Sequence, residues 1–303
     1  MGDFMNRWGI AFIGGMLLHS LCLADPFEDW AKTQALEVIA AKDDLSFNSE
    51  PKEFGVFTNY RNSILRPADK GTGPFPALVL LHGCSGIGDR AMRQWIEGAL
   101  TEGFVVSVVD SMRGNKSNCY PPLPVSTGRR VKDAYDALAV LSGLPFVDAK
   151  RISVAGLSQG GTVTILSGSK NMASLYKPVA RFAAGVAIYP NCFVPAKIAG
   201  FDAEYVRQDT EAPLLSLMGG DDLYTPANEC LPMLEKLKLS GNQVEWHVYP
   251  NATHAWDSED AHGRSSTTYR GDKVTFRYDR GVTEDSRKRL FEFLKKHAGS
   301  SGK

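Results

Sequence analysis

One serine lies in a sequence pattern that is typical of a nucleophile. Ser158 stands between Gly156 and Gly160 in the stretch "RISVAGLSQGG". The β-branched run before the serine predicts a buried strand, and the small residues after it are compatible with a helix. A strand, a sharp turn through serine and a helix make up a nucleophile elbow, in which a Cβ at either flanking position would clash with the neighbouring strand or helix. The pattern predicts a nucleophile at Ser158, and a glycine-rich turn without chemistry is the alternative.

Two later motifs supply the base and the carboxylate that a nucleophilic serine needs. In proteins with a nucleophile elbow, these partners follow the serine in the order acid, then histidine, on loops after later strands. His254 follows the last predicted strand, and Asp221 and Asp222 follow the strand before it. We therefore predict His254 as the base and one of the two adjacent aspartates as the acid. Asp257, three residues after the histidine, is interpreted as a surface carboxylate.

Two backbone N–H groups are predicted to bind the oxyanion that forms when a serine attacks a carbonyl group. Losing one such donor typically costs on the order of 3 kcal/mol. The first is the N–H of Gln159, which directly follows the serine at the start of the predicted helix. The second is the N–H of Cys84 in "LLHGCSG", after an early predicted strand. An ordinary glycine turn is the alternative interpretation of that stretch.

Alternating strands and helices must position these residues. Apolar runs predict strands at 77–83, 104–110, 151–156, 182–190, 212–220 and 244–250, and helical periodicity predicts helices at 92–100, 128–144, 230–239 and 283–297. This alternation indicates an α/β fold with a mostly parallel central sheet and helices on both faces. Ligands of such sheets bind at the carboxyl ends of the strands. The long irregular stretch 111–127 follows one of these ends, and we expect it to form a wall of the pocket.

The composition fits one globular domain without a polyanionic partner. The chain has 303 residues, of which 43% are hydrophobic and 22% charged, and its formal net charge is zero. This length is sufficient for a large core, and a single domain is predicted over residues 25–303. The balanced charge gives no support for nucleic acid or an anionic membrane surface as a partner. The oligomeric state does not follow from the sequence.

The N-terminus has the pattern of a secretory signal. Arg7 precedes a run without formal charge, Trp8–Ala24, which ends in small and apolar residues. This pattern predicts a signal peptide over residues 1–24 that is cleaved after Ala24, and hence a periplasmic or secreted protein. An uncleaved anchor is the main alternative.

Removal of residues 1–24 leaves four cysteines, Cys84, Cys119, Cys192 and Cys230. An even number in an exported protein permits disulfides. Three pairings are possible, and the sequence alone does not choose between them. Chain order in an α/β sheet favours Cys84 with Cys119 and Cys192 with Cys230, because each pair lies on loops after neighbouring strands. Four buried thiols are the alternative. No cysteine and histidine spacing resembles a zinc site, so we expect neither a metal nor a cofactor.

In combination, the motifs resemble those of a known family. "LLHGCSG", "GLSQGG", "GGDDLYTP" and "YPNATHAWD" at this spacing are similar to the dienelactone hydrolase family of α/β-hydrolases, over roughly residues 52–297. The resemblance implies an α/β-hydrolase fold without a separate cap domain, in agreement with the short predicted connection 191–211. In the family's acid loop the catalytic aspartate begins an Asp-x-x-x-Pro pattern. Here that pattern runs from Asp222 to Pro226, which implies Asp222 rather than Asp221 as the acid.

The sequence departs from this family's namesake enzymes at the nucleophile. Those enzymes use a cysteine to open a cyclic enol lactone that carries a carboxylate, whereas this elbow holds Ser158. The resemblance therefore implies a broader carboxylic ester hydrolase that acts on small-molecule esters or lactones through an acyl-enzyme. Arg113 or Arg129 is a candidate to bind a substrate carboxylate, and a solvent-exposed arginine explains each equally well. A peptidase or acyltransferase on the same scaffold, and a non-catalytic binding protein with this fold, are the alternative functions.

Overall fold

The computed structural model describes residues 29–34, 48–52, 62–68, 70–88, 90–113, 115, 119, 123–198, 201–268 and 270–298, with the backbone alone at 48–52, 194–198 and 201–203. The predicted signal peptide over residues 1–24 lies outside this set. Within these ranges no helix is both long and apolar enough to span a membrane.

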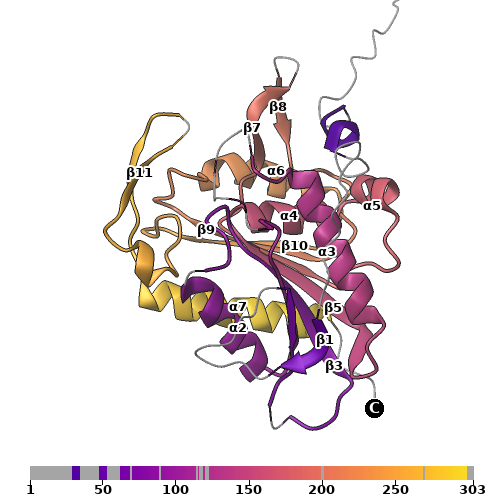
Figure 1. Cartoon of the computed structure of the whole chain (residues 1–303). Helices are drawn as coiled ribbons and strands as arrows, with labels where there is room; N and C mark the ends of the chain where they lie inside the picture. Colours follow the sequence, from indigo (N-terminus) through magenta and orange to yellow (C-terminus); the bar gives the residue numbers. More distant parts are fainter. Residues whose placement is uncertain are drawn as a thin grey trace, which may run out of the picture.

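An eight-stranded sheet forms the centre of the molecule (Figure 1). Its strands lie in the order β1 (Asn48–Lys52), β2 (Ser63–Leu65), β4 (Val105–Val109), β3 (Phe75–Leu81), β5 (Val147–Leu157), β6 (Gly185–Ile188), β9 (Leu214–Gly219) and β10 (Val244–Tyr249). The strands from β4 to β10 are parallel, and β2 is antiparallel to β4. The prediction of a mostly parallel sheet is confirmed. The chain order reverses between β3 and β5, which is where ligands bind in sheets of this kind.

Helices cover both faces of the sheet because side chains alternate along each buried strand. On β3, Leu78 and Leu80 pack in one core cluster with residues of α2 (Arg90–Thr101) and α7 (Arg280–His297). Val79 and Leu81 point to the opposite face and pack in a second cluster. That face is covered by α3 (Thr127–Ser142), α4 (Gln159–Ser167), α5 (Lys170–Tyr176) and α6 (Ala227–Leu239). Figure 1 shows α2 and α7 on one side of the sheet and α3 and α4 on the other.

Capping residues set the helix ends more exactly than apolar periodicity does. The Asp279 side chain accepts a hydrogen bond from the Val282 N–H at 3.0 Å, so α7 begins three residues before the predicted start at Thr283. Ser126 caps α3 in the same way, since its hydroxyl accepts from the Arg129 N–H at 3.2 Å. The first residues of α7, Arg280 and Gly281, do not continue its apolar pattern, which is why the predicted start was late.

Two hairpins were not predicted from the sequence. One pairs β7 (Phe193–Ile198) with β8 (Phe201–Glu204), and the other pairs β11 (Ser265–Thr267) with β12 (Lys273–Thr275). Both extend away from the central sheet (Figure 1). The first lies in the connection between β6 and β9, and the described part of that connection forms this hairpin instead of a cap domain. A 3-10 turn, η1 (Glu259–Ala261), precedes the second.

Candidate active site

Ser158 occupies a strained turn between β5 and α4. Its φ of 52° and ψ of −117° lie in a region that side chains other than glycine rarely adopt. The surrounding backbone holds it there: the Ser158 N–H donates to the Ile188 carbonyl at 2.9 Å, and its carbonyl accepts from the Thr162 N–H at 3.1 Å. The strain is thus maintained by β6 on one side and by the first turn of α4 on the other.

The two glycines that flank the serine are required by close backbone contacts. A Cβ on Gly156 would lie 2.2 Å from the Gly160 carbonyl oxygen. A Cβ on Gly160 would lie 2.5 Å from the carbonyl oxygen of Leu81, the last residue of β3. Both distances are below any normal contact, so the spacing Gly-x-Ser-x-Gly follows from the packing of α4 against two strands.

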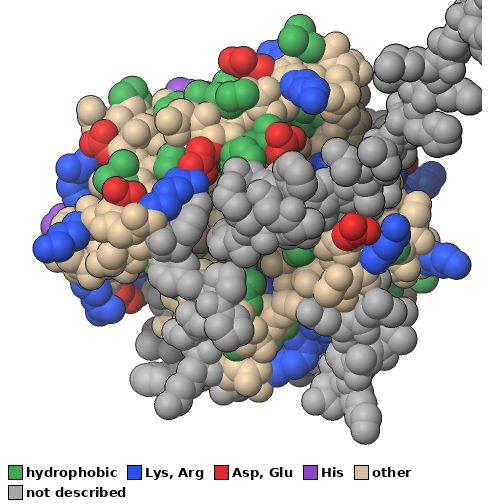
Figure 2. Space-filling model, turned by 90° about the horizontal axis from the view of Figure 1, so that it is seen from above, with side chains coloured by type: hydrophobic (Ala, Val, Ile, Leu, Met, Phe, Trp, Pro, Cys, Tyr) green, Lys and Arg blue, Asp and Glu red, His purple; other side chains and the backbone are tan. Residues whose placement is uncertain are grey.

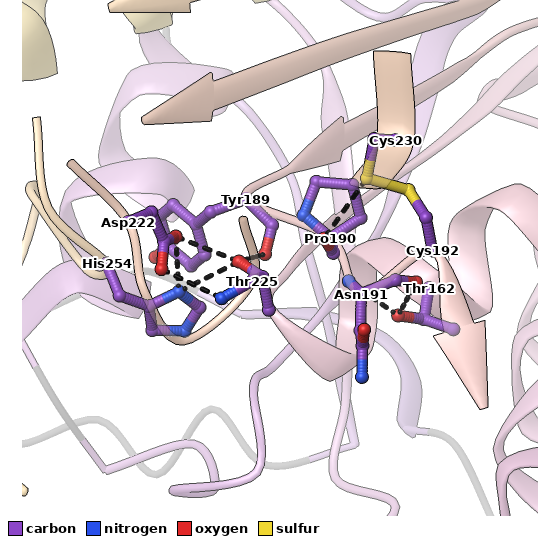
Figure 3. Close-up of a disulfide and its surroundings, with 9 residues drawn as sticks. All are labelled: Thr162, Tyr189, Pro190, Asn191, Cys192, Asp222, Thr225, Cys230 and His254. Atoms are coloured by element: carbon purple, nitrogen blue, oxygen red, sulfur yellow. Dashed lines mark hydrogen bonds and ion pairs between the residues drawn. A yellow bond between two sulfur atoms is a disulfide. The ribbon is translucent and has the colours of Figure 1, made fainter. Parts of the chain in front are cut away.

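The structure brings Ser158, His254 and Asp222 together from the loops after β5, β10 and β9. The Nε2 atom of His254 lies 3.0 Å from the Ser158 Oγ, and its Nδ1 lies 2.8 Å from the Asp222 Oδ2. The N–H groups of Tyr224 and Thr225 both donate to the Asp222 Oδ1 at 2.8 Å. Figure 3 shows Asp222, Thr225 and His254 pointing toward one another. The carboxylate is 1% exposed and its orientation is fixed by these donors.

The two adjacent aspartates have different partners. The Asp221 side chain is half-exposed and its carboxylate forms an ion pair with Arg277 at 2.7 Å. Asp222 alone reaches the histidine. The glycines before them allow this loop to approach the loop of His254, because a Cβ on Gly219 would lie 2.4 Å from the Ala252 carbonyl oxygen.

Asp257 is buried, and its interpretation as a surface carboxylate was wrong. Its Oδ1 accepts from the Tyr189 hydroxyl at 2.7 Å and its Oδ2 from the Trp95 indole N–H at 2.6 Å. The chain turns inward at Ala255, which has a φ of 55°, and this change of direction cannot be seen in the sequence. Burial raises the pKa of the Asp257 carboxyl, and the two hydrogen bonds oppose that rise. The Tyr189 ring in turn packs against the His254 ring, with 4.7 Å between centroids.

A cavity opens beside Ser158. The described residues that line it are Cys84, Cys119, Leu123, Thr127, Ser158, Gln159, Thr162, Asn191, Tyr205, Tyr224 and Thr225. Both predicted oxyanion donors, Cys84 and Gln159, are therefore next to the serine, and a Cβ on Gly83 would lie 3.4 Å from the Ser158 Cβ. Three residues of the stretch 111–127 belong to this lining, as expected for a pocket wall.

Sequence reasoning missed several lining residues. Tyr224 and Thr225 stand in the quoted acid loop and could have been inferred from it. Tyr205 follows the unpredicted β7–β8 hairpin, and no local sequence pattern indicates its position.

Figure 2 views the molecule from the side toward which that hairpin projects, and acidic and basic side chains are interspersed over the described part of this face.

Two disulfides cross-link segments of the described chain near the cavity. Cys84 is bonded to Cys119, and Cys192 is bonded to Cys230, which is the pairing that the chain order favoured. The first bond joins two residues of the cavity lining. The second joins the segment after β6 to α6, close to Asn191 and Thr162 (Figure 3).

The structure does not bring Arg113 or Arg129 to the serine. The Arg113 guanidinium bonds both oxygens of Asp133, at 2.9 Å and 2.5 Å, and the Arg129 Nε bonds the same carboxylate at 3.1 Å. Asp133 is fully buried, and a buried carboxylate requires such partners. Neither arginine is among the described residues of the cavity lining.

A parallel sheet of this order, with a serine on a strained turn after β5, defines an α/β-hydrolase. The chain belongs to the dienelactone hydrolase family, whose model matches residues 62–298. Membership of this family makes the protein a carboxylic ester hydrolase.

Individual relatives are distant. The "Putative carboxymethylenebutenolidase" of Methylorubrum extorquens is 25% identical over 221 residues, which are 69% of this chain and 71% of the relative. A protein of the same name from Escherichia coli K12 is 23% identical over 238 residues, or 75% and 79% of the two chains. The solved structure of Thermogutta terrifontis esterase 2 phosphonylated by cyclosarin has a TM-score of 0.59 and 17% identity, and the match covers 79% of this chain and 90% of that one. This last likeness shows the shared fold.

Proposed function

We propose that the protein hydrolyses carboxylic esters or lactones through an acyl-enzyme on Ser158, with His254 as the base and Asp222 as the orienting acid. The observation that carries this proposal is the continuous relay from Oγ to Nε2 at 3.0 Å and from Nδ1 to Oδ2 at 2.8 Å. These are ordinary hydrogen-bond lengths, so the relay needs no rearrangement before it can move a proton.

In the acylation step, the Ser158 Oγ attacks the ester carbonyl carbon while Nε2 of His254 takes the hydroxyl proton. The Asp222 carboxylate accepts a hydrogen bond from the Nδ1–H of His254 and stabilises the imidazolium that forms. The backbone N–H groups of Cys84 and Gln159 donate to the oxyanion. Collapse of the tetrahedral intermediate breaks the ester bond, and the leaving alcohol receives the proton from Nε2.

Deacylation repeats these steps with water as the nucleophile. His254 takes a proton from the water, which attacks the acyl carbonyl carbon, and the carboxylic acid leaves as the proton returns to the Ser158 Oγ. Both steps use the same proton acceptor and the same two oxyanion donors. No other group has to change its protonation state.

The cavity lining supports uncharged substrates. The described residues that line it carry hydroxyl, amide, aromatic and aliphatic groups and no carboxylate, ammonium or guanidinium group. The two arginines considered for a substrate carboxylate are paired with Asp133 instead. Structures of Thermogutta terrifontis esterase 2 with propionate and butyrate bound support short acyl groups as the first probes.

A panel of p-nitrophenyl acetate, p-nitrophenyl butyrate and neutral and anionic lactones tests this proposal. We expect Ser158→Ala and Asp222→Asn to lower kcat by at least ~10⁴-fold, as the loss of such groups does in other serine hydrolases. Far-ultraviolet circular dichroism of each variant checks the fold. Unchanged ester turnover by a folded Ser158→Ala variant would contradict the mechanism, and faster transfer to an added alcohol or amine than to water would favour the acyltransferase reading.

We also propose that the protein is exported, to the periplasm or beyond the cell. The uncharged run Trp8–Ala24 after Arg7 and the two disulfides support this localisation. Mass spectrometry of the protein recovered from an exported fraction is expected to find Asp25 as the first residue. Recovery of the intact N-terminus in the membrane fraction would favour the uncleaved anchor.

A further inference from the structure

Arg130 is a buried charged residue to which the proposed mechanism gives no role. It lies in the first turn of α3 and is 2% exposed. Burying a guanidinium group is costly unless it has hydrogen-bond partners. Its partners therefore indicate what it does.

Its guanidinium group bonds to two segments that carry the predicted oxyanion donors. The Nη2 atom donates to the His82 carbonyl oxygen, two residues before Cys84. The Nη1 atom donates to the side-chain oxygen of Gln159, the residue that follows the nucleophile. One planar group therefore joins the loop after β3 to the start of α4. Because a guanidinium fork is rigid, it fixes the distance between the two segments.

The His82 ring contacts the same loop after β3. Its Nε2 accepts the Ser111 N–H at 3.2 Å, so the proton of a neutral ring is on Nδ1, which lies 2.5 Å from the Gly83 carbonyl oxygen and 3.3 Å from the Arg130 Nη2. The ring is completely buried. The backbone before Cys84 is thus held by Arg130 at one carbonyl and by the histidine ring at the next.

The charge of Arg130 is directed at neutral acceptors. The two oxygens that accept from its terminal nitrogens belong to a backbone carbonyl and an amide side chain, both uncharged, and Nη2 also lies 3.3 Å from the His82 Nδ1. The neighbouring Arg113 and Arg129 instead share the carboxylate of Asp133. Burial lowers the pKa of Arg130 to about 10, and the nearby carboxylates of Asp133 and Asp110 oppose that fall, so the group stays protonated at neutral pH.

We propose that Arg130 is a positioning residue that holds the N–H groups of Cys84 and Gln159 at the spacing an oxyanion requires, and that its positive charge stabilises the oxyanion from behind. This inference rests on the proposed function. A donor that is displaced by even a fraction of an ångström stabilises the transition state less, while it affects the binding of the neutral ester much less.

The test compares Arg130→Met and Arg130→Lys with the control Arg129→Lys, using p-nitrophenyl acetate as substrate and a trifluoromethyl ketone as a mimic of the tetrahedral intermediate. Arg129 is adjacent, also buried and bonded to Asp133. We expect Arg130→Met to lower kcat about 10²-fold, to change KM by less than about threefold, and to weaken inhibitor binding by the same factor as kcat/KM. Arg130→Lys keeps the positive charge but lacks the planar guanidinium group, so its kcat should lie between those of Arg130→Met and wild type.

If Arg130 had a purely structural role, Arg130→Met would lower the melting temperature without lowering kcat selectively relative to KM. Equal kcat for folded Arg130→Met and wild type would overturn the proposal, as would an equal fall in kcat for Arg129→Lys. Should Arg130→Met fail to fold, Gln159→Met separates the cases, because it cuts one bond of the fork and keeps the buried charge. We expect about a tenfold loss of kcat from it, and no loss would overturn the proposal.

Ser158→Ala, measured in parallel, separates this inference from the proposed function. If Ser158→Ala is inactive and Arg130→Met is fully active, only the proposed role of Arg130 is contradicted. If Ser158→Ala is active, both the proposed nucleophile and the proposed oxyanion site are contradicted.

Discussion

The two disulfides cross-link chain segments of nearly equal length in very different surroundings. Cys84 and Cys119 are separated by 35 residues, and Cys192 and Cys230 by 38. A chain-entropy model gives each closure about 4 kcal/mol of stabilisation. Any difference between the effects of the two bonds must therefore come from what surrounds them.

The first bond lies in the cavity wall and the second in the core. Cys84 and Cys119 are half-buried and line the cavity beside Ser158. Cys192 and Cys230 are each 1% exposed and pack in the core cluster of α6. We therefore expect the first bond to affect both the site and stability, and the second to affect stability alone.

Of the two disulfides, the first should have the larger effect on catalysis when it is removed. In Cys84→Ala/Cys119→Ala, the backbone N–H of residue 84 remains, but the loop that positions it loses its covalent link. We expect kcat/KM for p-nitrophenyl acetate to fall about 10²-fold, toward the cost of losing an oxyanion donor, and the free energy of unfolding to fall by about 4 kcal/mol. Steady-state kinetics and urea denaturation measure the two quantities.

The matched control is Cys192→Ala/Cys230→Ala. It should lose a similar free energy of unfolding, about 4 kcal/mol, while kcat/KM stays within about threefold of wild type. Equal losses of kcat/KM in the two double variants would show that the distinction between site and core is wrong.

Asp257 is a fully buried carboxyl group that contacts the His254 ring through Tyr189. Burial raises its folded-state pKa above the ordinary value of 3.8, so the folded protein binds this proton more tightly than the unfolded chain. The contribution of this group to stability is therefore present at low pH and is lost as the pH rises from about the ordinary value through the raised pKa. We expect Asp257→Asn to gain stability relative to wild type over that rise.

Urea denaturation of both proteins at a series of acidic to neutral pH values measures this difference. A difference in unfolding free energy that does not change with pH would contradict the raised pKa of Asp257. Ester turnover at neutral pH reports separately whether the loop of His254 keeps its position.

The smallest effect is expected at Asp221, the exposed neighbour of Asp222. Its ion pair with Arg277 joins two half-exposed side chains, and such pairs contribute about 1 kcal/mol or less. Asp221→Asn should keep kcat within about twofold of wild type and lose less than about 1 kcal/mol of unfolding free energy. A loss of kcat similar to that of Asp222→Asn would mean that the two aspartates had been assigned in the wrong order.

Much of the fold followed from local patterns in the sequence. The strands of the parallel sheet are apolar runs with sharp ends, and the Gly-x-Ser-x-Gly spacing reflects contacts of Gly156 and Gly160 that no other residue tolerates. The loops after β9 and β10 could be placed because parallel strands bring their carboxyl ends to one edge. These features depend on short-range sequence and on sheet geometry alone.

The remainder depends on contacts between distant residues. Asp133 is 20 residues from Arg113, and nothing near that arginine in the sequence reveals the partner that keeps it from a substrate carboxylate. Asp257 looked exposed because its partners Trp95 and Tyr189 come from α2 and from the end of β6. Tyr205 reaches the cavity after a hairpin whose first strand, Phe193–Ile198, has no alternating pattern. Tertiary contacts decide these positions.

The central claim, that Ser158 is the nucleophile, is tested most directly by peptide mass spectrometry after treatment with paraoxon, which phosphorylates the structural relative Thermogutta terrifontis esterase 2. The relay from Asp222 through His254 predicts a single adduct on the peptide that contains Ser158, and no adduct in Ser158→Ala. An adduct on another residue, or equal labelling of the alanine variant, would contradict it.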